Sequence, residues 1–179
     1  MSAHIVALER DVLNGSLTRA RMGALDLVIW LGASGAIHVW QDRCPHRSVR
    51  LSAGRNMGTY LEDPYHGWQF GEDGTVIAVP AERGKPHPEI SARVLPSKVA
   101  GGFVWAGEGE VIGKPLQGTP ARPLHFAVPT ETLRPHLDPN TNHLTPWGDA
   151  ESMVYPTSDD PLVCFNEMSA LRRRLEGTA

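Results

Sequence analysis

Two short groups of residues in the first half of the chain place the strongest constraint on its fold. The first is Cys44-Pro45-His46 and the second is Asp63-Pro64-Tyr65-His66. Each begins with an ionisable side chain, ends in a histidine and contains a proline, which fixes its own φ and favours a stiff turn. The four donor side chains can reach one metal centre only if the fold brings these two loops together.

The side chains of Cys44, His46, Asp63 and His66 form a mixed set of sulfur, nitrogen and oxygen donors. Such a set suits iron or zinc better than calcium or magnesium, which prefer oxygen ligands. Each residue alone has a simpler interpretation: a small buried cysteine, a hydrogen-bonded histidine or a loop aspartate that accepts backbone N–H bonds. The combination of all four in this spacing favours a metal centre.

The segments around the two loops have the pattern of short strands separated by turns. Residues 24–31 and 37–41 predict one hairpin, and residues 68–70 and 75–79 predict another. Further strands are expected at residues 4–8, 17–22, 59–62, 93–99 and 103–106, with a polar connection over residues 80–88. Together with 18 glycines and 15 prolines, this pattern predicts an all-β fold, an antiparallel sandwich or small barrel.

After residue 114 the strand pattern is lost and prolines become frequent. This change predicts a β domain over residues 1–114 and an irregular, proline-rich extension over residues 115–179. The extension is expected to end in a helix. Asp160 can cap it, Pro161 suits its first position and Gly177 can end it. Apolar side chains recur at helical spacing within it, at Phe165, Met168, Leu171 and Leu175.

Composition excludes several classes of protein. The hydrophobic fraction of 41%, the charged fraction of 21% and the net charge of -3 give no basic surface for nucleic acid or an anionic membrane. No basic N-terminal region precedes an apolar run, so a cytoplasmic protein is expected. Without an export signal, Cys44 and Cys164 are expected to be a metal ligand or reduced thiols rather than a disulfide.

The loops and their surroundings resemble the cluster-binding domain of the Rieske non-haem iron oxygenases. The resemblance covers residues 17–106, and Phe103-Val104-Trp105 is similar to the final strand of that domain. It implies a Rieske-like antiparallel β-sandwich with two cluster-binding loops. The motifs that carry it are Cys44-Pro45-His46-Arg47-Ser48, Pro64-Tyr65-His66-Gly67-Trp68-Gln69-Phe70, Asp73-Gly74 and residues 77–80.

In that family two thiolates bind the inner iron of a [2Fe-2S] cluster, and two imidazoles bind the outer iron. By position, the resemblance implies Cys44 on the inner iron and His46 and His66 on the outer one, close together and partly exposed. Asp63 stands where the family has the second thiolate. A carboxylate is a harder ligand, so a less robust cluster with a different spectrum is expected. Cys164 is the other thiol, but it is expected to be a small core residue of the terminal helix.

The family enzymes also carry a catalytic iron held by two histidines and a carboxylate. The nearest candidates here are His136, Asp138 and His143, but too few residues follow the β domain for a catalytic domain, so no catalytic residue is predicted. These three are expected to be exposed polar residues of a proline-rich loop. Ordinary surface histidines are expected at positions 38, 87 and 125. Trp68 and Trp105 are expected to be core or cluster-shielding aromatic residues, and Trp30 and Trp40 to be core residues.

Three functions are consistent with the sequence. The first is an electron-transfer protein or truncated oxygenase component that passes single electrons through the cluster to a redox partner protein, a reductase or an oxygenase component. The second is a mononuclear iron or zinc site that acts as a Lewis acid. The third is a metal-free interaction subunit of an oxidoreductase that reuses the fold.

Overall fold

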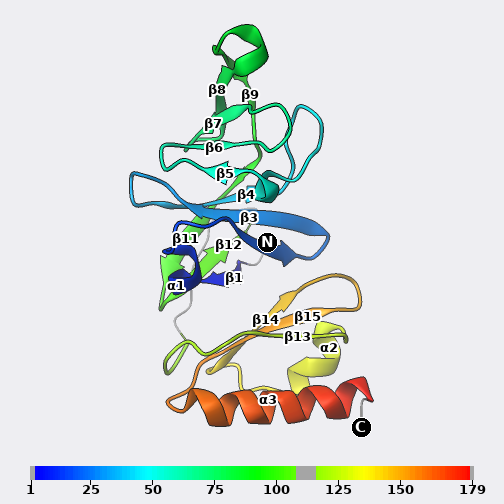
Figure 1. Cartoon of the computed structure of the whole chain (residues 1–179). Coiled ribbons are helices and arrows are strands. Elements are labelled where there is room, and N and C mark those ends of the chain that lie inside the picture. Colours follow the sequence, from blue (N-terminus) through cyan, green and yellow to red (C-terminus); the bar gives the residue numbers. More distant parts are fainter. Residues whose placement is uncertain (1–2, 108–115, 178–179) are drawn as a thin grey trace.

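The computed structural model describes residues 3–107 and 116–177 (Figure 1). Its strands form four antiparallel sheets, which are stacked along the long axis of the molecule in Figure 1. A five-stranded sheet lies at one end, and a three-stranded sheet covered by the C-terminal helix lies at the other. The all-β class predicted from the sequence is confirmed.

Two sheets make up the middle of the stack. One has the strand order β1-β12-β11 and the other β10-β4-β3-β2, with the short helix α1 (Glu9–Val12) after β1. The predicted hairpin of β3 and β4 is confirmed, with Trp30 opposite His38 in its register. The bounds are β1 His4–Leu8, β2 Thr18–Met22, β3 Leu25–Leu31, β4 Ile37–Gln41, β10 Val94–Leu95, β11 Ser97–Ala100 and β12 Phe103–Ala106.

The five-stranded sheet has the order β5-β6-β7-β8-β9 and borders both predicted loops. The predicted hairpin of β7 and β8 is confirmed. The bounds are β5 Arg55–Asn56, β6 Tyr60–Glu62, β7 Gln69–Gly71, β8 Thr75–Val79 and β9 Lys85–Ser91, with short 3₁₀ helices η1 Leu51–Ala53 and η2 Pro80–Glu82.

The predicted polar connection over residues 80–88 is wrong in its second half, because β9 begins at Lys85 and pairs with β8. Most of its side chains are exposed, so the strand has no alternation of apolar and polar residues that the sequence could show. Pro86 and Pro88 are tolerated there because β9 is an edge strand.

The core of the five-stranded sheet continues into the β3–β4 hairpin. Trp30 and Trp40 are fully buried, as predicted, and their rings meet edge to face at 5.1 Å between centroids. Trp40 also contacts Phe70 at 6.4 Å. Cys44 belongs to this cluster of buried side chains, so the first predicted loop is anchored in the core.

The C-terminal part is more regular than the sequence indicated. It contains a sheet of order β13-β15-β14, namely β13 Leu124–Phe126, β14 Asn142–Pro146 and β15 Ser152–Pro156. The short helix α2 (Thr130–Leu133) and the 3₁₀ helix η3 (Arg134–His136) connect β13 to β14. Prolines at the ends of β14 and β15 hid these strands, because proline normally indicates a break in a strand.

The terminal helix is confirmed as α3, Pro161–Glu176. The Asp160 carboxylate accepts hydrogen bonds from the backbone N–H groups of Leu162 and Val163, both at 3.1 Å, and Gly177 ends the helix at φ +69°. Met168, Leu171 and Leu175 pack on the C-terminal sheet. Phe165 does not belong to that face, since it is 39% exposed and lies under the Arg122 guanidinium at 6.0 Å.

The C-terminal sheet is docked on the strands of the N-terminal part. Tyr155 is 3% exposed and packs in one cluster with Phe103 and Trp105. The Thr145 hydroxyl donates to the Ile5 carbonyl at 2.6 Å. The predicted boundary at residues 114 and 115 lies outside the described residues. No helix within residues 3–107 and 116–177 is long and apolar enough to cross a membrane.

Candidate metal centre

The first loop joins β4 to η1 and is held by its own backbone. The Cys44 N–H donates to the Val49 carbonyl at 2.8 Å, and the Ser48 N–H donates to the Cys44 carbonyl at 2.9 Å. Ser48 takes φ +59°, the left-handed conformation that closes this turn. At the loop entrance the buried Asp42 carboxylate accepts the Ser52 N–H at 2.7 Å and its hydroxyl at 2.6 Å. The loop is therefore fixed at both ends.

The second loop joins β6 to β7 and is organised by one carboxylate oxygen. Oδ1 of Asp63 accepts the backbone N–H groups of Tyr65 at 2.8 Å, His66 at 2.9 Å and Gly67 at 3.2 Å. The Asp63 N–H closes the loop onto the Trp68 carbonyl at 2.9 Å. A loop aspartate that accepts successive N–H bonds is an Asx-type cap, so Asp63 has a structural role in this loop whatever else it does.

A buried pair of donors lies between the loops. Cys44 is fully buried, Asp63 is 3% exposed, and the Cys44 thiol donates to Oδ2 of Asp63 at 3.1 Å. Burial, together with this hydrogen bond to Asp63, raises the pKa of the Cys44 thiol to about 11, although backbone N–H groups of His46 and Arg47 partly oppose the shift. The thiol is therefore protonated at neutral pH, and a metal must displace its proton to bind.

An exposed pair of donors lies beside it. The Nδ1 atoms of His46 and His66 are 3.2 Å apart. The His46 ring stacks on Trp68 with 4.4 Å between centroids and 7° between planes, and the His66 ring stacks on Tyr65 at 3.9 Å. His66 is exposed and His46 half-buried, so the prediction that these histidines approach each other while partly exposed agrees with the structure. Stacking fixes both rings without covering them.

The four predicted donors thus form two pairs rather than one group. Within the described parts of the chain, no three histidine, cysteine, aspartate or glutamate side chains are gathered so that they could hold one metal ion. A mononuclear site needs at least three protein ligands around one point. A cluster with two irons needs one pair of ligands for each iron, one buried and one exposed in this case.

A family model of the Rieske [2Fe-2S] domain matches residues 2–96. The chain belongs to this family. The cofactor of the domain is a [2Fe-2S] cluster, and the match covers both loops and the five-stranded sheet.

Two curated relatives from Pseudomonas putida illustrate the family. The chain is 36% identical over 115 residues to "Oxidoreductase NdmD", covering 62% of this chain and 19% of that protein. It is 35% identical over 98 residues to "Phthalate 4,5-dioxygenase oxygenase subunit", covering 54% of this chain and 22% of that protein. The chain therefore spans about a fifth of the length of each of these relatives.

The fold likeness extends beyond the matched domain. The structure of NdmA from Pseudomonas putida CBB5 superposes with a TM-score of 0.74 at 16% identity, covering 97% of this chain and 78% of that one. The docked C-terminal sheet and α3 are thus part of the shared fold.

The residues present fit a Rieske cluster at three of four positions. The Nδ1 atoms of the exposed His66 and the half-buried His46 face each other at 3.2 Å, and Cys44 is fully buried in the core. Asp63 fits with one atom, because its Oδ1 is occupied by three backbone N–H groups and only Oδ2, which faces the thiol, is available to a metal.

The other candidate residues are scattered. Cys164 is buried on α3, as predicted, at the opposite end of the molecule from the five-stranded sheet (Figure 1). His136 is exposed in η3, and Asp138 accepts two hydrogen bonds from Asn140. The prediction for His143 is wrong, because it lies on β14 with its ring 4.9 Å from that of Trp105.

Two predicted surface histidines are also more buried than expected. The His38 side chain is 16% exposed and bonds the Glu72 carboxylate at 3.0 Å, and the His87 side chain is 17% exposed between Glu82 and Glu89. The contact of His38 with Glu72 joins residues 34 positions apart, so no local pattern indicates it, whereas Glu82 and Glu89 lie within five residues of His87. His125 is 41% exposed beside Glu151, as expected for a surface histidine.

Proposed function

We propose that this chain is a Rieske-type electron-transfer component that passes single electrons through a [2Fe-2S] cluster held by Cys44, Asp63, His46 and His66. The observation that supports it is the division of the donors into a buried pair and an exposed pair, the arrangement that a two-iron cluster with unlike irons requires. Cys44 and Asp63 would hold the inner iron, and His46 and His66 the outer one.

The chain's own residues have separate tasks in this proposal. The buried thiol and carboxylate keep water away from the inner side of the site. Trp68 and Tyr65 hold the imidazoles by stacking, so the ring orientation is set before any metal binds. When bound, the cluster supplies one-electron oxidation and reduction. The exposed edges of His46 and His66 offer the shortest path to a docked redox partner protein, a reductase or an oxygenase component.

Elemental analysis of the purified protein tests the proposal. Reconstitution without oxygen should give two irons and two acid-labile sulfides per chain, as the cofactor formula requires, with a Rieske-type electron paramagnetic resonance signal after reduction. One metal without sulfide would support a mononuclear iron or zinc site instead. The absence of both metal and sulfide in a folded protein would overturn the proposal.

A second candidate has an observation in its favour. The Asp63 carboxylate is fully used without any metal, since Oδ1 binds three N–H groups and Oδ2 binds the Cys44 thiol. Such a network allows the loops to stay folded in a metal-free interaction subunit of an oxidoreductase. The same reconstitution separates the two functions, because the metal-free protein would keep its fold and take up neither iron nor sulfide.

A further inference from the structure

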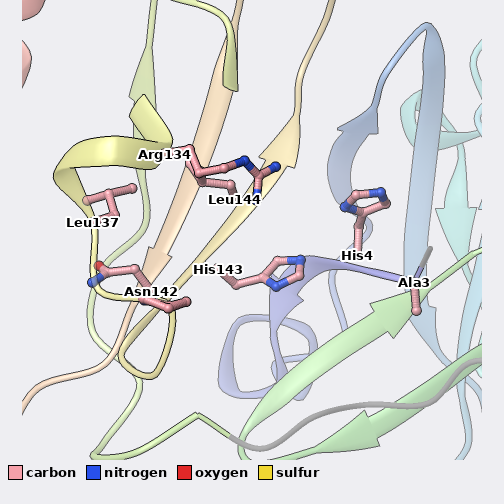
Figure 2. Close-up of a pocket in the computed structure, with 8 residues that line it drawn as sticks. Ala3, His4, Arg134, Leu137, Asn142, His143 and Leu144 are labelled. Carbon is pink, nitrogen blue, oxygen red and sulfur yellow. The ribbon is translucent and has the colours of Figure 1, made fainter. Parts of the chain in front are cut away.

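A cavity of about 480 Å³ lies where the C-terminal part meets β1, away from both loops. It is lined by Ala3 and His4 from the N-terminal part and, on the other side, by residues of η3, β14 and the turn between them. In Figure 2 the side chains of Arg134 and His143 extend toward His4. The volume is in the range of pockets that hold small organic ligands.

Arg134 supplies the charge of this cavity. It is exposed, and no carboxylate among the described residues pairs with it. The nearby Asp138 does not line the cavity, and its Oδ1 accepts the Asn140 N–H at 2.9 Å and the Asn140 amide at 3.1 Å. An arginine with no partner presents a planar set of N–H donors that matches a carboxylate in two parallel hydrogen bonds.

The two histidines are neutral and differ in what they offer. Burial lowers the pKa of His143 to about 4, with further lowering from His4 and Arg134, and burial also lowers the pKa of His4. Nδ1 of His4 is buried without a hydrogen-bond partner, and the Leu144 backbone beside the ring opposes part of the pKa shift. Nε2 of His143 is also buried without a partner. Because an unpaired N–H is rarely buried, the proton of His143 belongs on Nδ1 rather than on Nε2.

Most of the remaining wall is apolar, apart from Asn142, whose amide donates to the Asp138 carbonyl at 3.1 Å and to the Thr141 hydroxyl at 3.0 Å. Ala3, Leu137, Pro139 and Leu144 line the cavity beside the polar groups. A hydrated inorganic anion gains nothing from such walls, whereas an organic anion buries its hydrocarbon part against them.

We propose that this cavity binds a small organic carboxylate. Its carboxylate pairs with the Arg134 guanidinium and accepts the Nδ1–H of His143, while its apolar body packs on Leu137 and Leu144. His4 forms the far wall and donates no hydrogen bond to the ligand. The site needs both parts of the fold, since Arg134 and His143 come from the C-terminal part and His4 comes from β1.

Isothermal titration calorimetry on the full chain tests the site with cyclohexanecarboxylate and its neutral isostere cyclohexanecarboxamide. The carboxylate should bind saturably and the amide at least about tenfold more weakly, because charge-assisted hydrogen bonds are worth about twice neutral ones. Equal binding of the two compounds, or no binding of the carboxylate, would overturn the proposal. If inorganic phosphate binds as tightly as the carboxylate, the claim that the cavity prefers an organic anion would be overturned.

Variants locate the site. Arg134→Gln should weaken carboxylate binding at least about tenfold, since a hydrogen-bonded charge partner is lost. Arg172→Gln, at an exposed arginine of α3, is the matched control and should change nothing. His143→Phe keeps the ring but removes the Nδ1–H, so a smaller loss of affinity is expected. Unchanged affinity in both Arg134→Gln and His143→Phe would show that the carboxylate binds elsewhere.

Discussion

Two pairs of histidines lie in opposite environments in this molecule. His46 and His66 lie at the loops with their Nδ1 atoms facing each other at 3.2 Å, stacked on aromatic rings but open to solvent. His4 and His143 lie where the C-terminal sheet docks, with ring centroids 5.8 Å apart and one nitrogen of each buried without a partner.

The difference between the two pairs shows what makes histidines suitable as ligands. Imidazoles bind a metal when both present a lone pair to the same point and remain accessible. The loop pair, His46 and His66, brings both Nδ1 atoms to one point at the surface, because each ring is held by a neighbouring aromatic side chain. The docking pair, His4 and His143, does not meet the first condition, since the two rings meet edge to face with 5.8 Å between centroids, and burial keeps it neutral. Its role in the fold is therefore packing, with one N–H left for a ligand.

The largest effect is expected from removing the loop pair. His46→Ala or His66→Ala should abolish retention of iron and sulfide, while the thermal unfolding transition stays close to that of the unchanged protein without metal, because the His66 ring is exposed and the His46 ring is half-buried. Metal analysis and circular dichroism measure the two outcomes. His125→Ala, at a histidine that is 41% exposed, is the control and should keep its iron. Unchanged iron content in both loop variants would remove these histidines from the site.

A chain truncated after residue 114 retains the loop pair and loses His143. We expect it to fold and to bind the cluster, but with a free energy of unfolding lower by about 5 kcal/mol, since Tyr155 and its apolar neighbours are each worth about 1.5–3 kcal/mol. Denaturant unfolding of the two chains measures the difference. Loss of the cooperative transition would mean that the C-terminal sheet belongs to the same folding unit.

Asp63 links the buried donor pair to the loop that carries His66. Asp63→Ala should destabilise the metal-free protein by about 3 kcal/mol, because three backbone N–H groups lose their acceptor, whereas Asp63→Asn keeps Oδ1 and should lose less.

Asp63→Cys should strengthen a red-brown cluster chromophore, because it supplies the second thiolate. A folded Asp63→Cys protein that takes up no cluster would mean that the loops are not arranged for one.

The smallest effect concerns the docking pair and pH. The pKa of His143 is about 4 in the folded chain, against 6.5 for the free side chain, chiefly through burial and with further lowering from the neighbouring His4 on β1 and Arg134 on η3. The unfolded chain therefore takes up a proton that the folded chain refuses. The contribution of neutral His143 to the free energy of unfolding is fully present above pH 6.5. It falls by about 2 kcal/mol as the pH drops toward 4, after allowance for the partial exposure of the ring. Urea unfolding of His143→Gln should show a weaker loss over this range, and an identical pH profile would contradict the assignment.

The sequence by itself determined the features that depend on near neighbours. The β3–β4 and β7–β8 hairpins follow from alternating segments on either side of a turn, and α3 follows from Asp160, Pro161 and Gly177 at its ends. The two loops are also local, because a proline and a few backbone hydrogen bonds close each of them. These interactions act within a few residues, so their pattern is visible in one stretch of sequence.

Only the tertiary structure decided which distant groups meet. The pairing of His4 with His143, the docking of the C-terminal sheet and the placement of β9 depend on contacts between segments far apart in the chain. The use of the two Asp63 oxygens, one for the loop and one for Cys44, is likewise set by how the loops face each other. A carboxylate at that position looks the same in sequence whether it caps a loop, binds a metal or does both, because its chemistry is fixed by the donors that folding places around it.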